Sequence, residues 1–323
     1  MKLVKVNKQS YLKYSNEFEN LPISFNPDLG GFLLKAGFKE TFYVLKINQK
    51  CIGLLPVYNK NKNNFSVPYF SYGLILKITL NDRVIKNLRN VLKKNLINFK
   101  IKLVGSINDN IRLDKVSCFL SLKQSTEIQL NSFKSKLRSQ IRKGYKNGLK
   151  CKIGGKEFIN DFWEIYSRNL HNLGSPSYSK NFFYLLFENL NENQIKIFII
   201  LHDSKPIGSS LCLSYNSFCE VILASTLKDY NQLSPNMMMY WEMIANSIES
   251  KKTIFSFGRS DLNSSQLRFK KQWGVNLVPI MYLNSNEKIL NLKFLKKIFS
   301  RIWKFIPYRV SKYFGYLIAE KFY

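Results

Sequence analysis

A strand hairpin that occurs twice is the feature that most constrains the fold of this chain. Residues 42–47 and 51–58 are β-rich runs joined by Asn-Gln-Lys, and residues 194–201 and 207–215 are β-rich runs joined by a short polar turn. The segments KINQKCIG and LHDSKPIG correspond closely, and each places a glycine at the same relative position. A repeated supersecondary order predicts two similar domains.

Further patterns complete each half of the chain. Apolar spacing predicts a helix over 81–99 followed by a strand over 101–104, and in the second half a strand over 219–226 followed by a helix over 236–248. A length of 323 residues suits about two domains. We therefore predict an α+β chain whose parts are a first domain at 1–120, a second domain at 121–285 and a C-terminal tail at 286–323.

The charge balance points to a polyanionic partner. The chain has 50 Lys and Arg against 21 Asp and Glu, a formal net charge of +29. Its 45% hydrophobic and 15% aromatic residues indicate a globular protein and disfavour disorder over most of the chain. Candidate partners are tRNA, anionic lipid headgroups, nucleotide-sugar phosphates or an acidic polysaccharide. A compositional bias that fills surface positions with lysine is the alternative explanation.

Cysteines and histidines form no recognisable site. The five cysteines are widely spaced without a C-x-x-C pair, and we expect buried thiols. His171 and His202 are the only histidines and lie far apart in sequence, so the chain predicts no metal site, no catalytic triad and no cofactor. The sequence shows no signal-peptide pattern and no run of ~20 apolar residues. We therefore expect a protein that is cytoplasmic or peripheral on the inner face of the cytoplasmic membrane.

Residues 255–274, FSFGRSDLNSSQLRFKKQWG, place a basic and aromatic cluster behind a strand. The strand is expected to end at Gly258, which puts Arg259 at the strand end, and residues 266–273 have the length of about two helical turns. A helix start beside a strand end is a natural anion site. A loop and a solvated helix packed by Phe269 and Trp273 are the alternative.

The pattern FGRS followed by FKKQWG resembles the C-terminal signature of the FemAB-like acyl- and aminoacyltransferases, in particular the branch associated with bacterial exosortase and exopolysaccharide loci. Segments 137–148, 173–183 and 234–241 are similar to further parts of that family. The family usually has an acid where this chain has Ser256, a departure that puts a role for a carboxylate on this strand in doubt. The resemblance implies tandem GNAT-like (acyl-CoA N-acyltransferase-like) domains.

The densest basic stretch lies at 134–150, where helical spacing stacks Arg138 and Arg142 on one face. Two arginines placed in this way can bind phosphate in a bidentate manner. A solvated basic face is the alternative.

The entrance to the helix predicted at 236–248 lacks a feature that acetyl-CoA needs. GNAT domains that use acetyl-CoA place a glycine-rich turn there, because backbone N–H groups must approach a pyrophosphate. Residues 227–236 contain no glycine, which disfavours acetyl-CoA as the donor. Ser234 and Asn236 are expected to cap the helix, with Pro235 in its first turn.

The C-terminal tail has the pattern of a basic amphipathic helix from Lys288 to Ile306, followed by an aromatic-rich segment. Acidic residues are absent between Glu287 and Glu320. An interfacial membrane anchor and a helical pair packed on the core both fit this pattern.

The family resemblance implies transfer of an acyl or aminoacyl group, from aminoacyl-tRNA or another acyl donor, to an amine of a nucleotide- or lipid-linked glycan or peptide acceptor in peptidoglycan or exopolysaccharide synthesis. An aminoacyl ester is already activated, so the enzyme needs to position the amine and stabilise the oxyanion. We expect Lys270 to stabilise the oxyanion, Phe269 to form a wall of the site, and Arg259 to bind phosphate or brace the loop. The residues expected to bind substrate are Arg138, Arg142, Lys143, Tyr178, Phe269 and Asn236.

Two other functions remain open from the sequence. One is CoA-dependent N-acyltransfer to an aminosugar. The other is a non-catalytic module that binds tRNA or an anionic membrane, in which Lys270→Ala would leave binding intact.

Overall fold

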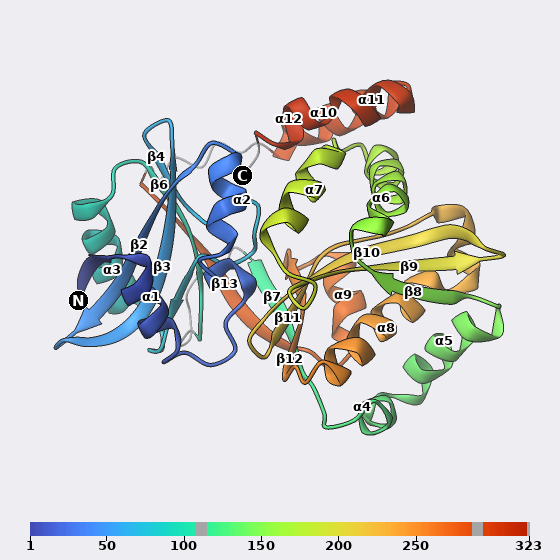
Figure 1. The fold of residues 1–323 in the computed structure, drawn as a ribbon, viewed down its shortest axis with the longest axis horizontal. Coiled ribbons are helices and arrows are strands. Elements are labelled where there is room, and N and C mark those ends of the chain that lie inside the picture. Colours follow the sequence, from blue (N-terminus) through green and yellow to red (C-terminus); the bar gives the residue numbers. More distant parts are fainter. Residues whose placement is uncertain (107–114, 286–292, 322–323) are drawn as a thin grey trace. The chain divides into compact units, whose positions relative to one another are not determined.

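The computed structural model describes residues 1–106, 115–285 and 293–321, and they divide into two compact units (Figure 1). Unit 1 contains 1–121, 214–220 and 253–288, and unit 2 contains 122–213, 221–252 and 289–323. The units interleave in sequence because late segments of the chain return to pair with strands of the first half. The domain boundaries expected from the sequence stay a prediction.

Unit 1 is a mixed sheet with helices on both faces. Its strands run in the order β1-β2-β3-β4-β6-β13-β7-β12, β5 pairs with β3 and β6, and residues 218–220 pair in parallel with β12. The strands are β1 (Lys2–Val6), β2 (Lys39–Ile47), β3 (Lys50–Lys60), β4 (Asn63–Ser66), β5 (Leu74–Leu76), β6 (Phe99–Val104), β7 (Lys115–Ser121), β12 (Ile254–Ser260) and β13 (Asn276–Asn284). The helices are α1 (Lys8–Ser15), η1 (Ile23–Phe25), α2 (Leu29–Lys35), α3 (Asp82–Asn95) and α9 (Ser265–Lys271).

Strand alternation gives unit 1 two separate cores. Successive side chains of a strand point to opposite faces, so Leu45 packs in the core under α3 while its neighbour Val44 packs in the core under α1 and η1. Leu55 and Leu54 divide in the same way. Both faces of this sheet are therefore buried, which explains why its strands are nearly continuous hydrophobic runs.

Unit 2 holds a second hairpin-based sheet. Its strands follow the order β11-β10-β9-β8. The strands are β8 (Lys150–Gly154), β9 (Ile195–His202), β10 (Lys205–Tyr215) and β11 (Phe218–Thr226). The helices are α4 (Thr126–Ser132), α5 (Ser135–Lys146), η2 (Lys156–Phe158), α6 (Ile159–Leu173), α7 (Lys180–Asn189), η3 (Lys228–Leu233), α8 (Pro235–Glu249), α10 (Lys293–Phe305), α11 (Tyr308–Phe314) and α12 (Tyr316–Ala319).

Two adjacent serines show which helices cover which face of this sheet. The Ser209 hydroxyl donates to the Phe162 carbonyl of α6, and the Ser210 hydroxyl contacts Met243 Sδ of α8. Neighbouring strand residues point to opposite faces, so α6 and α8 lie on opposite sides of the sheet, as Figure 1 also shows. Helix α5 packs against α8, and α7 packs against α6.

The sequence predicted these elements well. The hairpins at β2–β3 and β9–β10 and the helices α3 and α8 are confirmed. Gly53 is required by space, because a Cβ there would lie 2.9 Å from the Ile75 carbonyl oxygen. Four of the five cysteines are buried as predicted, whereas Cys151 is half-buried.

Candidate functional site

The signature segment forms a β-bulge in unit 1. β12 does not end at Gly258, as the sequence predicted, but continues to Ser260, and its register with β7 shifts between Ser256 and Arg259. Gly258 has a φ of 70°, in the left-handed region that other residues adopt only at a cost. The bulge therefore requires the glycine of the FGR motif.

Ser256 closes the bulge from one face of the sheet. Its hydroxyl oxygen accepts a hydrogen bond from the Gly258 N–H at 3.1 Å and lies 2.8 Å from the Tyr72 hydroxyl, which also contacts the Ser117 hydroxyl. A bulge leaves backbone groups without ladder partners, and a short hydroxyl can satisfy one of them. The serine at the family's acid position thus has a structural role.

Lys270 closes the bulge by binding its carbonyl groups. Its Nζ donates to the Gly258 carbonyl at 3.2 Å and to the Arg259 carbonyl at 2.9 Å, and the side chain is only 7% exposed. The buried position follows from α9, which is capped by the Ser264 hydroxyl and packs on β12 and β7. Burial lowers the pKa of Lys270 to about 8, with the positive charge of Arg259 acting in the same direction.

Arg259 lies on the same face as Ser256 and is half-buried. Its guanidinium donates to the Tyr282 hydroxyl of β13 at 2.8 Å. The second predicted role of Arg259, bracing this segment, fits that contact, and the first, phosphate binding, stays a prediction.

Glu220 is the functional candidate that the sequence analysis missed. It pairs directly with Ser256 in the parallel β11–β12 register and is fully buried. Neither of its carboxylate oxygens has a hydrogen bond of standard geometry among the described residues, but the Ser71 side chain lies near enough to stabilise the charged form. Burial raises the pKa of Glu220 to about 7, although Ser71 and the positive charge of Arg259 act to lower it. The acid absent from position 256 is thus present one strand away, at the paired position.

A second cation, the half-buried Lys102, adjoins the same face. Lys102 Nζ donates to the carbonyl oxygens of Val67 and Phe70 at 2.9 and 2.6 Å. Burial lowers its pKa well below the usual range, the charge of Arg259 lowers it further, and that of Glu220 raises it. Glu220, Arg259 and Lys102 therefore form one electrostatically linked group.

The basic helix α5 lies in unit 2, and its cationic side chains are less buried than Lys270. Arg142 and Lys143 are exposed, and Arg138 donates to the Asn131 carbonyl at 3.1 Å. Gly144 lets α5 approach α8 closely, because a Cβ there would lie 2.9 Å from Met238 Cβ. The cations of α5 thus remain available to solvent while its other face packs.

The entrance to α8 differs from the prediction in one respect. Pro235 occupies the first turn as expected, but the Ser234 side chain makes no capping hydrogen bond and its φ is 65°. A residue in this left-handed conformation cannot present the extended backbone of an ordinary N-cap, so the predicted cap is wrong for Ser234. Asn236 is half-buried in the first turn of α8.

Tyr178 lies among aromatic side chains between α6 and α7. Its ring stacks on Phe182 with centroids 4.4 Å apart, and its carbonyl accepts a hydrogen bond from Trp163 Nε1 at 3.0 Å. Because α6 and α8 cover opposite faces of the unit 2 sheet, Tyr178 does not join the cations of α5.

The structure thus brings together one part of the predicted set. Lys270 and Arg259 meet at the bulge, and Phe269 lies on the same helix as Lys270, with its ring 6.3 Å from that of Trp273. The signal that identifies Glu220 in the sequence is a lone carboxylate inside an apolar strand, CEVILAST. Within the described ranges, no group of three or more His, Cys, Asp or Glu side chains is arranged to hold a metal ion. None of the helices in that part of the chain is long and apolar enough to cross a membrane.

Comparison with known families finds a match for a central part of the chain. Residues 131–271 match the family model described as an acetyltransferase (GNAT) domain. No curated protein sequence matches the chain. The predicted acyltransferase class is confirmed by this domain.

Solved structures extend the likeness to nearly the whole chain. FemX has a TM-score of 0.62 at 12% identity, covering 93% of this chain and 100% of that one. L-PGS from Bacillus licheniformis has a TM-score of 0.51 at 10% identity, covering 93% and 98%. A tandem GNAT protein from the clavulanic acid biosynthesis pathway, solved without AcCoA, has a TM-score of 0.50 at 9% identity, covering 89% and 99%. The predicted tandem GNAT-like, FemAB-like fold is therefore confirmed.

Proposed function

We propose that this protein transfers an acyl or aminoacyl group to an amine of a cell-envelope glycan or peptidoglycan-type precursor. The observation that carries the proposal is the bulge of β12, where Lys270 is buried against the carbonyl groups of Gly258 and Arg259 within a GNAT-type chain. The acceptor class follows from the resemblance of FGRS and FKKQWG to the FemAB-like family.

The chemistry requires a stabilised oxyanion. The amine nitrogen attacks the carbonyl carbon of the donor, a C–N bond forms, the C–O bond of an ester donor breaks, and the proton released by the amine passes to the leaving oxygen. Two N–H groups of the Lys270 ammonium bind the carbonyl groups of the bulge, and in this proposal the third donates to the developing oxyanion. A pKa of about 8 keeps much of this side chain charged near neutral pH.

Glu220 acts in this proposal as a positioning residue in place of the missing acid at position 256. Its pairing with Ser256 puts a carboxylate on the face that carries Arg259, whose positive charge acts to lower the pKa of Glu220. Arg259 then takes a fixed orientation toward Tyr282. A swap tests this assignment: Glu220→Ser should lower the rate, and adding Ser256→Asp to it should restore a large part. Failure of the double variant to recover, with its fold intact, would refute the assignment.

The reaction is tested by mass spectrometry of lipid- and nucleotide-linked glycan intermediates from cells with wild-type protein, no protein or Lys270→Ala. An added acyl or aminoacyl mass seen only with wild type supports the transferase and identifies the group and its acceptor. No difference among the three strains, with the protein expressed and folded, favours the non-catalytic binding module.

A CoA-dependent N-acyltransferase acting on an aminosugar is the second candidate. The match to an acetyltransferase domain favours it. The entrance to α8 opposes it, because residues 227–236 have no glycine and Ser234 itself takes the left-handed conformation. Calorimetry with acetyl-CoA and with a long-chain acyl-CoA separates the candidates, since heat of binding from either one supports a CoA donor.

A further inference from the structure

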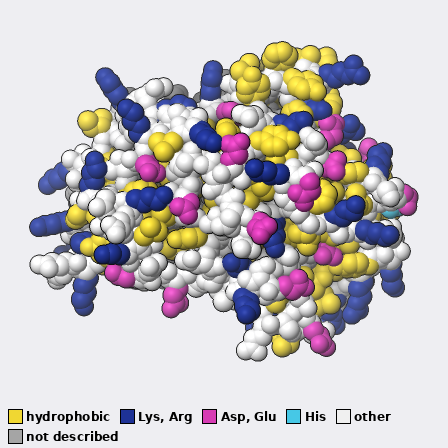
Figure 2. Space-filling view, in the orientation of Figure 1, with side chains coloured by type: hydrophobic (Ala, Val, Ile, Leu, Met, Phe, Trp, Pro, Cys, Tyr) yellow, Lys and Arg dark blue, Asp and Glu magenta, His cyan; other side chains and the backbone are white. Residues whose placement is uncertain are grey.

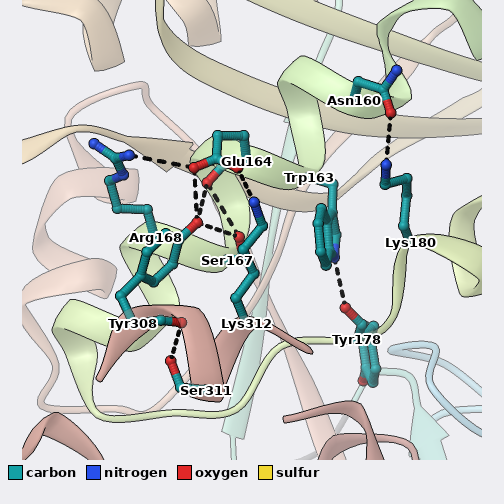
Figure 3. Close-up of polar contacts among 10 residues, drawn as sticks. All are labelled: Asn160, Trp163, Glu164, Ser167, Arg168, Tyr178, Lys180, Tyr308, Ser311 and Lys312. Carbon is teal, nitrogen blue, oxygen red and sulfur yellow. Dashed lines mark hydrogen bonds and ion pairs between the residues drawn. The ribbon is translucent and has the colours of Figure 1, made fainter. Parts of the chain in front are cut away.

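One face of the C-terminal helices packs on α6 within unit 2 (Figure 3). Lys312 Nζ binds the Glu164 carboxylate, and the Tyr308 hydroxyl donates to Glu164 Oε1 at 3.0 Å. The Ser311 hydroxyl lies 2.9 Å from His171 Nδ1. Part of the tail therefore packs on the core, as one of the two interpretations of the sequence expected. The other interpretation, an interfacial membrane anchor, concerns the side chains that stay exposed. The first residues of the predicted tail helix, 288–292, lie outside the described residues.

Close approach fixes α10 in this position. Gly174 ends α6 with a φ of 77°, and a Cβ on it would lie 2.3 Å from the Ser300 carbonyl oxygen. The Ser300 hydroxyl donates to the Leu173 carbonyl at 3.1 Å. Trp303 is buried on the same side of the helix. These contacts fix which side of α10 points away from the core.

Large apolar side chains of the C-terminal helices are exposed, and we call this set the tail face. Two of its members also have contacts on the packed side, because the Tyr313 ring lies against Trp163 of α6 and the Phe299 ring stacks on Trp303. Phe305 is 88% exposed, and Tyr313 and Phe314 are each about 60% exposed. Figure 2 shows hydrophobic side chains gathered over the C-terminal helices at the top of the view, with Lys and Arg beside them. An exposed apolar cluster of this kind marks an interaction site. The tail face consists of Ile298, Phe299, Ile302, Phe305, Val310, Tyr313, Phe314 and Leu317.

The charge around the tail face selects its partner. Arg301, Lys304 and Arg309 are exposed on the same helices. The only carboxylate side chain in the described tail, Glu320, accepts a hydrogen bond from the Ser179 hydroxyl at 2.6 Å and so is engaged with the core. A second copy of this chain would bring like charges together, whereas anionic lipid headgroups would neutralise them.

We propose that the tail face docks on an anionic lipid bilayer, with its aromatic and aliphatic side chains in the interfacial region and Arg301, Lys304 and Arg309 against the headgroups. The helices lie in the plane of the interface and do not span it. This inference goes beyond the proposed reaction and does not depend on it.

The test is co-sedimentation of the full chain with lipid vesicles. One set contains phosphatidylcholine with about 30% phosphatidylglycerol and the other phosphatidylcholine alone, each at about 0.1 and 0.5 M salt. Because the chain has a net charge of +29, any of its faces can adsorb to an anionic surface, so the decisive variants leave the charge unchanged. Phe305→Ser with Phe314→Ser removes apolar area from the tail face, and Leu34→Ser with Ile97→Ser removes it from exposed positions of unit 1.

We expect wild type to bind the anionic vesicles, more weakly at high salt. The Phe305→Ser and Phe314→Ser variant should bind at least about tenfold less tightly, while the unit 1 control stays within about twofold of wild type. Equal binding by both variants, with unchanged melting temperatures, overturns the proposal. A concentration-dependent dimer that the tail variant abolishes also overturns it, in favour of an interface between copies. Vesicle binding that persists when no acyl transfer is detected separates failure of the proposed reaction from failure of the docking surface.

Discussion

Helices α9 and α5 both carry several cationic residues, but the two helices differ in whether these side chains are buried. Lys270 of α9 is buried and binds two backbone carbonyls, whereas Arg142 and Lys143 of α5 are exposed. A buried cation must be held by specific partners, because its desolvation is costly. An exposed cation needs no partner and interacts through a field that salt screens. We propose from this difference that α9 carries the chemistry and that α5 attracts an anionic substrate at long range.

Removing the Lys270 charge should change the free energy of unfolding more than any other substitution proposed for these two helices. Lys270→Met leaves the carbonyl groups of Gly258 and Arg259 without their partner, so we expect a loss of roughly 3–5 kcal/mol in the free energy of unfolding. The exposed neighbour Lys271 is the matched control, and Lys271→Met should change it by less than about 0.5 kcal/mol. Urea denaturation of both variants measures the difference, and equal values would show that the bulge does not need Lys270.

The buried carboxylate should give the next largest effect, seen as a dependence on pH. The folded-state pKa of Glu220 is raised from 4.5 to about 7, so its contribution to stability is full below pH 4.5 and is lost as pH rises through 7. Glu220→Gln lacks this loss. Its stability relative to wild type should therefore increase by about 3 kcal/mol between about pH 4 and pH 8.

Denaturation of Glu220→Gln, of the exposed-site control Glu19→Gln and of wild type across this pH range tests the shift. A difference that stays constant with pH for Glu220→Gln would contradict it. The same variant should also alter the pH profile of the transfer rate, which a purely structural role would leave in place.

The conformation of the bulge should have a smaller effect. Gly258→Ala puts a Cβ on a residue with a φ of 70°, and we expect a loss of about 1–2 kcal/mol. Gly105→Ala is the control, because the nearest atom to its Cβ would be Leu80 Cδ1 at 3.7 Å. Thermal unfolding compares them, and a Gly258→Ala variant as stable as the control would mean that the bulge tolerates other residues.

The smallest effect on stability is expected on α5. Arg142→Gln should leave the free energy of unfolding within about 0.5 kcal/mol and raise KM for an anionic acceptor by about two- to fivefold, an increase that high salt removes. Lys136→Gln, exposed on a different side of the same helix, is the control. Equal KM values for the two variants would reduce α5 to a solvated basic face.

The sequence predicted the fold because each element has a local cause. Hairpin turns, helix caps and apolar spacing act within a few residues, so β2–β3, β9–β10 and α3 were all anticipated. Pairing between distant strands is not local. The position of Glu220 opposite Ser256 follows only from the pairing of β11 with β12.

The sequence pattern also could not predict which side chains are buried. Lys270 and Lys271 are adjacent lysines in the motif FKKQWG, and only the packing of α9 on β7 and β12 decides which one turns inward. The same limit applied to Gly258, which was expected to end a strand and instead forms a bulge within it.

The most direct test of the central claim is the transfer rate of purified wild type, Lys270→Met and Lys271→Met, measured with the envelope precursor and acyl donor that mass spectrometry identifies. Circular dichroism of the same samples gives the folded fraction. We predict that Lys270→Met loses about 10²–10³-fold in rate per folded molecule and that Lys271→Met retains nearly all of it. A Lys270→Met rate within about threefold of wild type would contradict the assignment of chemistry to Lys270 of α9.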